Sequence, residues 1–175
     1  MNSGAGAGAG AGASGGTRDS GAAGRVGVML LHFGEPESTT PEEVIPFLER
    51  IFLANAALEG DVEPEAARAR SRELAERRAP GLIAEYEAIG GSPLKRQAAD
   101  QRELLAEELR RRGHAVRVYT GMQFTEPLIE DAAARALADG VDTLVALPVY
   151  PLCGPSTTVA ALAQLARAVD ALGWD

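Results

Sequence analysis

The stretch of sequence that decides the fold is Val26-Gly-Val-Met-Leu-Leu-His-Phe-Gly-Glu-Pro36. Residues 26–31 are apolar or glycine and do not alternate with polar residues as a half-buried strand would. A strand that is apolar on both sides is typical of a parallel sheet covered by helices on both faces. Ligands of such sheets bind just beyond the carboxyl ends of the strands. We therefore predict a buried strand followed by a candidate site at 32–36.

Two later segments predict further strands, each followed by its own loop. Residues 115–119 form a short strand pattern, and 141–149 are almost wholly apolar, which predicts the central strand of the sheet. The three exit loops carry Phe33, Phe124 and Tyr150, although only 5% of the chain is aromatic. A large, flat, apolar ligand would suit this edge. The alternative, that these rings only pack the loops against the core, stays open at this point.

Helical patterns separate the strands. Thr40, Pro41 and Glu43 have the residue types of a capping box, and Ser92-Pro93 predicts another helix start. Pro80 predicts a break between two helices, and Ser156 a cap for the last one. The predicted helices cover 41–54, 64–78, 81–89, 93–112, 126–138 and 156–172. The alternation of strands and helices predicts an α/β fold with a parallel sheet flanked by helices, truncated before its next strand.

Composition limits the possible functions. Residues 1–24 are nearly all Gly, Ala and Ser, which predicts a disordered tail ahead of one domain over 25–175. The net charge of -8 argues against nucleic acid as a partner. The chain lacks an apolar run of the roughly 18 residues that a membrane span requires. The single Cys153 favours a reducing compartment, and we expect a cytoplasmic protein.

Common catalytic and cofactor motifs do not occur in the sequence. It lacks the glycine patterns of nucleotide-binding loops, the nucleophile elbow of hydrolases, and the His and Cys spacings of metal sites. Gly90-Gly91-Ser92 could bind an anion or simply separate two helices. Arg77 and Arg78 could hold an acidic ligand or form a solvated helix face, and His32 could be structural or a ligand. We therefore assign no catalytic and no metal-binding residue.

Three segments together resemble the ferrochelatase family. Residues 30–36 resemble its opening strand and turn, with the pattern L-x-x-G-x-P. Tyr86-Glu-Ala-Ile-Gly-Gly-Ser-Pro-Leu94 resembles the segment Y-x-x-I-G-G-x-S-P-L, although the loop is one residue shorter here. Leu147-Pro-Val-Tyr-Pro151 followed by Ser156-Thr-Thr158 resembles the third segment, L-P-x-Y-P…S-T-T. The resemblance covers 26–175 and implies a Rossmann-like chelatase half.

The resemblance implies insertion of ferrous iron into a porphyrin, coproporphyrin III or protoporphyrin IX, in haem biosynthesis. It implies these porphyrin-binding residues: Phe33, Arg77, Arg78, Tyr86, Ser92 and Tyr150. Iron is then a substrate, and we expect no tightly bound cofactor. We expect no iron-sulfur cluster either, because Pro155 takes the place of the family's cluster cysteine.

The resemblance also implies what this chain does not contain. The family's metal-handling His and its partner Glu lie in the second half of the enzyme. We therefore expect the porphyrin-binding front half alone, with a missing C-terminal half as partner. A non-catalytic tetrapyrrole carrier is the alternative. A nucleotide-binding α/β domain is disfavoured by the absent glycine motif.

Overall fold

The computed structural model describes residues 25–59 and 63–174, so the tail predicted over 1–24 lies outside the described residues. The elements follow in the order β1 (Val26–His32), α1 (Pro41–Glu59), α2 (Pro64–Ala88), α3 (Leu94–Arg111), β2 (Arg117–Met122), α4 (Ile129–Ala138), β3 (Thr143–Pro148), the π-helical turn η1 (Pro155–Val159) and α5 (Ala160–Ala171). This alternation confirms the predicted α/β fold.

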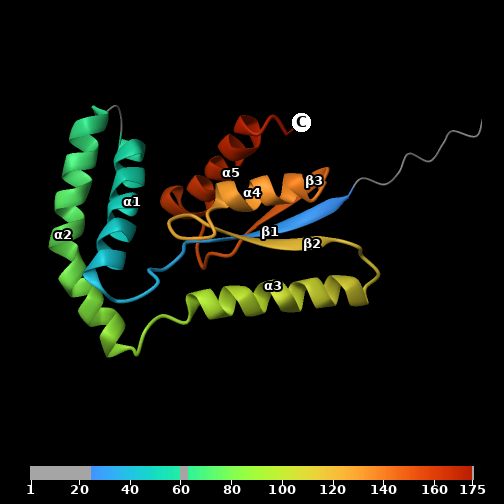
Figure 1. Cartoon of the computed structure of the whole chain (residues 1–175), viewed down its shortest axis with the longest axis horizontal. Coiled ribbons are helices and arrows are strands. Elements are labelled where there is room, and N and C mark those ends of the chain that lie inside the picture. Colours follow the sequence, from blue (N-terminus) through green and yellow to red (C-terminus); the bar gives the residue numbers. More distant parts are fainter. Residues whose placement is uncertain (1–24, 60–62, 175) are drawn as a thin grey trace, which may run out of the picture.

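The sheet has three parallel strands in the order β2-β1-β3, so β1 is central. Helices α4 and α5 cover one face and α3 the other (Figure 1). The prediction that β3 is the central strand is wrong. Its burial alternates along the strand, and Val145 and Leu147 are 48% and 46% exposed. They are exposed because α3 packs against β2 and β1, which leaves the same face of β3 uncovered.

The main core lies between the sheet and the α4–α5 layer. Met29, Leu31 and Ile129 are fully buried there, and Leu165 of α5 joins them. Gly121 of β2 makes this packing possible, because a Cβ at that position would lie 3.1 Å from the Ile129 Cα. Leu30, which points to the other face of β1, is 3% exposed, so the two-sided apolarity of this strand reflects burial on both faces.

Helices α1 and α2 form a hairpin that lies beside the carboxyl ends of the strands (Figure 1). Two predictions are wrong here, since α1 continues beyond its predicted end at 54 to Glu59, and α2 runs unbroken past Pro80. Ala75 and Ala79 lie one helical turn apart on α2. Both are buried in a hydrophobic cluster that also contains residues of α1. This tertiary packing offsets the hydrogen bond that Pro80 cannot make.

Smaller differences concern helix boundaries. Helix α4 begins at Ile129, later than predicted, because the Pro127 carbonyl accepts the Met122 N–H (2.8 Å) and ties the preceding loop to β2. Ser156 lies within η1 and makes no capping bond. Leu104 of α3 is 65% exposed although it is apolar. None of the helices in the described residues combines the length and apolar character needed to cross a membrane.

Candidate functional site

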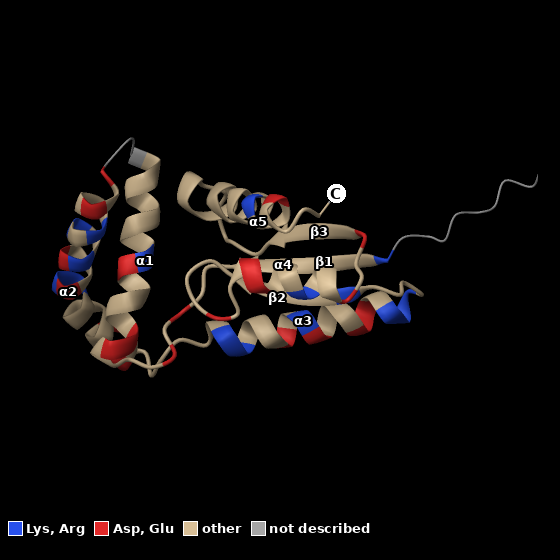
Figure 2. Ribbon diagram, turned by 45° about the horizontal axis from the view of Figure 1, so that its top comes forward, with Lys and Arg blue, Asp and Glu red and all other residues tan. Residues whose placement is uncertain are grey.

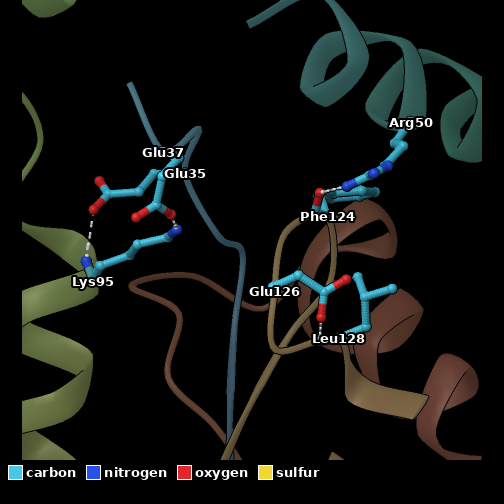
Figure 3. Close-up of polar contacts among 7 residues, drawn as sticks. All are labelled: Glu35, Glu37, Arg50, Lys95, Phe124, Glu126 and Leu128. Carbon is cyan, nitrogen blue, oxygen red and sulfur yellow. Dashed lines mark hydrogen bonds and ion pairs between the residues drawn. The ribbon is translucent and has the colours of Figure 1, made fainter. Parts of the chain in front are cut away.

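Phe33 and Phe124 meet where β1 and β2 end. Their ring centroids are 4.8 Å apart with planes inclined by 63°, and the Phe47 ring of α1 lies 6.3 Å from Phe33. Backbone bonds prolong the strand pairing into these loops, since the Phe124 N–H donates to the Phe33 carbonyl (3.2 Å). The Arg50 side chain donates to the Phe124 carbonyl (2.8 Å; Figure 3). The two rings are therefore fixed between the sheet edge and the α1–α2 hairpin.

Tyr150 is fixed on the β3 side of the same edge. Its hydroxyl donates a 2.6 Å hydrogen bond to Gln123 Oε1, and the preceding residue, Val149, donates its N–H to the Leu31 carbonyl (2.8 Å). Burial raises the pKa of Tyr150 well above its usual value, so the hydroxyl stays protonated. The Gln123 contact could not be predicted from the sequence, because the two residues lie 27 positions apart on separate exit loops.

Tyr86 and Ser92 line one cavity of about 220 Å³, together with Glu35 and Lys95. Glu35 is 6% exposed, and its Oε1 accepts the backbone N–H of Lys95 (2.7 Å; Figure 3). Ser92 Oγ accepts the N–H of Leu94 (3.3 Å), as expected of a residue at a helix start. Burial, and then the charge of Glu35, raise the pKa of Tyr86.

The turn that connects Phe33 to Glu35 depends on Gly34. Its φ is +95°, and a Cβ there would lie 2.5 Å from Thr125 Oγ1. Before it, His32 is 4% exposed, and its Nε2 has no hydrogen-bond partner among the described residues. Burial lowers the pKa of His32, which favours the neutral imidazole. His32 is thus a buried group of the sheet edge rather than a solvated one.

Arg77 and Arg78 lie on the exposed surface of α2. Arg78 pairs with Glu85 of the same helix (2.8 Å), an interaction in which both side chains are largely solvated. The six predicted residues thus fall into local groups. Phe33 lies with Phe124, and Tyr150 with the adjacent Gln123. Tyr86 lies with Ser92, and the arginines lie along α2.

Charged residues are dense along α2 and α3 and sparser on α1 and α5 (Figure 2). Over the part of the chain that the structure describes, no group of three or more His, Cys, Asp or Glu side chains could hold a metal ion. Cys153 is an exposed free thiol. The edge thus offers two partly exposed rings, Phe33 and Tyr150, together with an amide, hydroxyls and one buried carboxylate. Such a set can bind and orient a ligand.

Comparison with known proteins tests the resemblance directly. The family model "Ferrochelatase" matches residues 25–175. Curated proteins named "Ferrochelatase" are 38% identical over 148 residues in Synechococcus elongatus (84% of this chain, 38% of that protein) and 37% over 153 residues in a Nostoc species (82% and 37%). One from Gloeobacter violaceus is 37% identical over 134 residues (76% and 40%).

The chain spans about two fifths of the length of these curated relatives. Within the chain itself, the family match extends over the whole of the predicted domain, from the residue before β1 to the last residue. The match therefore includes all three segments that suggested the family. The chain belongs to the ferrochelatase family.

Proposed function

We propose that this chain provides the porphyrin-binding part of an enzyme that inserts ferrous iron into a porphyrin in haem biosynthesis. Family membership is the observation that carries the proposal. Phe33 and Tyr150, both partly exposed, follow the paired strands β1 and β3 at the same edge of the sheet. An apolar aromatic edge suits a flat macrocycle, because most of such a ligand's surface is itself apolar.

The proposed reaction makes definite demands on this edge. Ferrous iron replaces the two pyrrole N–H protons of the porphyrin, so the protons leave as the iron–nitrogen bonds form. The macrocycle must also bend out of plane to present its nitrogens to the metal. Rigid side chains on one face can favour the bent ring, using binding energy from the ring's periphery. Phe33 and Tyr150, fixed by Phe124 and Gln123, are the side chains we assign to this role.

The periphery of the ring carries carboxylates, and we assign the other predicted residues to contacts with them. Tyr86 and Ser92 line a cavity at the start of α3 and can donate hydrogen bonds through their hydroxyls. We propose that Arg77 and Arg78 bind the outer carboxylates of the ligand. Arg78 would have to leave Glu85 to reach one, which costs little because that pair is solvated.

Proton removal and metal delivery need groups that we expect in a further part of the enzyme. The exposed face of β3 supports this expectation, since Val145 and Leu147 are apolar yet about half exposed. A strand with apolar residues on both sides is typical of burial on both sides. We therefore propose that the rest of a full-length ferrochelatase covers β3 and supplies the proton-accepting His and Glu.

A porphyrin titration of the 175-residue chain tests the proposal. We expect saturable changes in the porphyrin Soret band with either coproporphyrin III or protoporphyrin IX, and little or no iron insertion when ferrous iron is added anaerobically. A saturable Soret change without any turnover also fits the alternative of a tetrapyrrole carrier. Adding the downstream half of the enzyme distinguishes the two hypotheses, because only an enzyme part, and not a carrier, should then restore iron insertion.

A matched pair of variants locates the binding surface. Tyr150→Phe removes a hydroxyl at the proposed site, and Tyr119→Phe removes one that donates to Asp139 (2.9 Å), away from the exit loops. We expect the first variant to weaken porphyrin binding and the second to leave it unchanged. Equal effects, or a wild-type chain without any saturable Soret change, would contradict the proposed site.

A further inference from the structure

The amino end of helix α3 is held by a carboxylate from a distant part of the chain. Glu35, in the loop after β1, lies 60 residues before Lys95 and accepts its backbone N–H at 2.7 Å (Figure 3). The first turns of helices attract anions, because their N–H groups lack partners within the helix and the helix dipole is positive there. Glu35 therefore occupies a position that an anionic ligand would otherwise favour.

Helix α3 provides few acceptors of its own for the free backbone N–H groups of its first turn. Its first turn carries no acidic residue, and Pro93 at the N-cap has no side-chain acceptor. Ser92 Oγ supplies a long contact of 3.3 Å to Leu94. The Glu35 carboxylate is consequently the one negatively charged group that the described residues place on a backbone N–H of this turn.

Only one of the two carboxylate oxygens of Glu35 has a hydrogen-bond partner among the described residues. Glu35 is just 6% exposed, yet its Oε2 has none. The carboxylate lines the same cavity as Tyr86 and Ser92, and its charge contributes to the raised pKa of Tyr86. A buried carboxylate with an unmatched oxygen gains less from its position than a fully paired one would.

The remaining charges of the cavity do not favour an added anion. Lys95 is the cation of its lining, and its Nζ is already paired with Glu37. A ligand carboxylate entering beside Ser92 would therefore meet two glutamates and no free ammonium group. Displacing Glu35 would change this, because the N–H of Lys95 would become free to bind the incoming carboxylate.

We propose that Glu35 is a built-in competitor for a carboxylate of the ligand, holding the amino end of α3 until a carboxylate-bearing tetrapyrrole displaces it. This inference rests on the proposed function for the identity of the ligand, but not for the competition itself. Glu35 then determines how strongly the Tyr86–Ser92 cavity selects for carboxylates. A porphyrin carboxylate that binds at the start of α3 would thus replace the Glu35 carboxylate there.

Acetate tests the competition without any porphyrin. The backbone amide signals of Leu94 and Lys95 are followed by NMR during an acetate titration at constant ionic strength, in the wild type and in Glu35→Ala. A hydrogen bond to a charged group corresponds to a factor of roughly ten or more in affinity. We expect the wild type to need at least about tenfold more acetate than Glu35→Ala for the same Lys95 shift.

Two further variants serve as checks. Glu35→Gln keeps the side-chain volume and the acceptor for Lys95 but removes the charge, so its response should lie between the other two even if Glu35→Ala folds poorly. Glu42→Gln removes the same charge from the exposed first turn of α1 and should behave like the wild type. Equal responses in the wild type and both Glu35 variants would overturn the inference.

The same variants, titrated with coproporphyrin III, connect the competition to function. We expect both Glu35 variants to bind the porphyrin more tightly than the wild type. If no variant binds porphyrin while the acetate responses differ as expected, the proposed function fails and the competition stands. If porphyrin binds but Glu35 variants bind no more tightly, the proposed function stands and this role of Glu35 is refuted.

Discussion

Replacing Gly34 by alanine should reveal how tightly the β1 exit turn is packed. The Gly34 φ of +95° costs about 1–2 kcal/mol for a residue with a side chain. The new Cβ would also lie 2.5 Å from Thr125 Oγ1 and 3.3 Å from Thr125 N. Thr125 is 8% exposed and cannot move freely, so this overlap should add the roughly 1–3 kcal/mol typical of overpacking. We expect a total loss of about 2–5 kcal/mol in the free energy of unfolding.

Gly113→Ala is the matched control. Its φ is +85°, but a Cβ there would have nothing within 4 Å. It should therefore cost only about 1–2 kcal/mol, and the entropic effect on the unfolded chain should be similar in both variants. Urea unfolding followed by far-UV circular dichroism measures both losses. With an m-value of about 2 kcal/mol/M, the midpoints of the two variants should differ by roughly 0.5–1.5 M.

A second substitution isolates the overlap. Thr125 Oγ1 has no hydrogen-bond partner among the described residues, so Thr125→Ala breaks no hydrogen bond in that part of the structure. It should restore part of the stability when combined with Gly34→Ala, and none when combined with Gly113→Ala. Equal losses for Gly34→Ala and Gly113→Ala, or no rescue by Thr125→Ala, would refute the reasoning.

Three other predictions can be checked by the same unfolding assay. Tyr150→Phe leaves Gln123 Oε1 without its donor (2.6 Å) and should lose about 1–2 kcal/mol. His32 has a folded-state pKa below its ordinary 6.5, so its contribution is complete above that pH and is lost as the pH falls through the folded-state value; His32→Gln should lose less stability on acidification than the wild type, and a parallel decline would contradict this. Pro80→Ala restores a donor within α2 and should gain about 1–3 kcal/mol in the free energy of unfolding; a loss of stability would contradict this expectation.

The central parts of the fold could be predicted from the sequence because their signals are local. The apolar run of β1 and the glycines and prolines around the loops identified the strands and most helix starts. The position of β3 in the sheet could not be predicted in this way. Its apolar pattern indicates two covered faces, whereas in the structure α3 packs against β2 and β1 and leaves one face of β3 exposed.

Long-range contacts account for the remaining errors. Pro80 predicts a helix break from local chemistry, but Ala75 and Ala79 are buried against α1, and this packing keeps α2 continuous. The hydrogen bond between Glu35 and Lys95 could not be predicted either, because the two residues lie 60 positions apart and no spacing rule connects them. Phe33 and Tyr150 were correctly expected at strand exits, since parallel strands end at a common edge.

The most direct test of the proposed binding edge is an NMR measurement of ring-current shifts on porphyrin addition. A macrocycle stacked on the sheet edge strongly shifts the resonances of the side chains beneath it. We predict large shifts for the Phe33 and Tyr150 rings, and none for Tyr119, whose hydroxyl is bonded to Asp139. Unchanged Phe33 and Tyr150 signals in the presence of bound porphyrin would contradict the account.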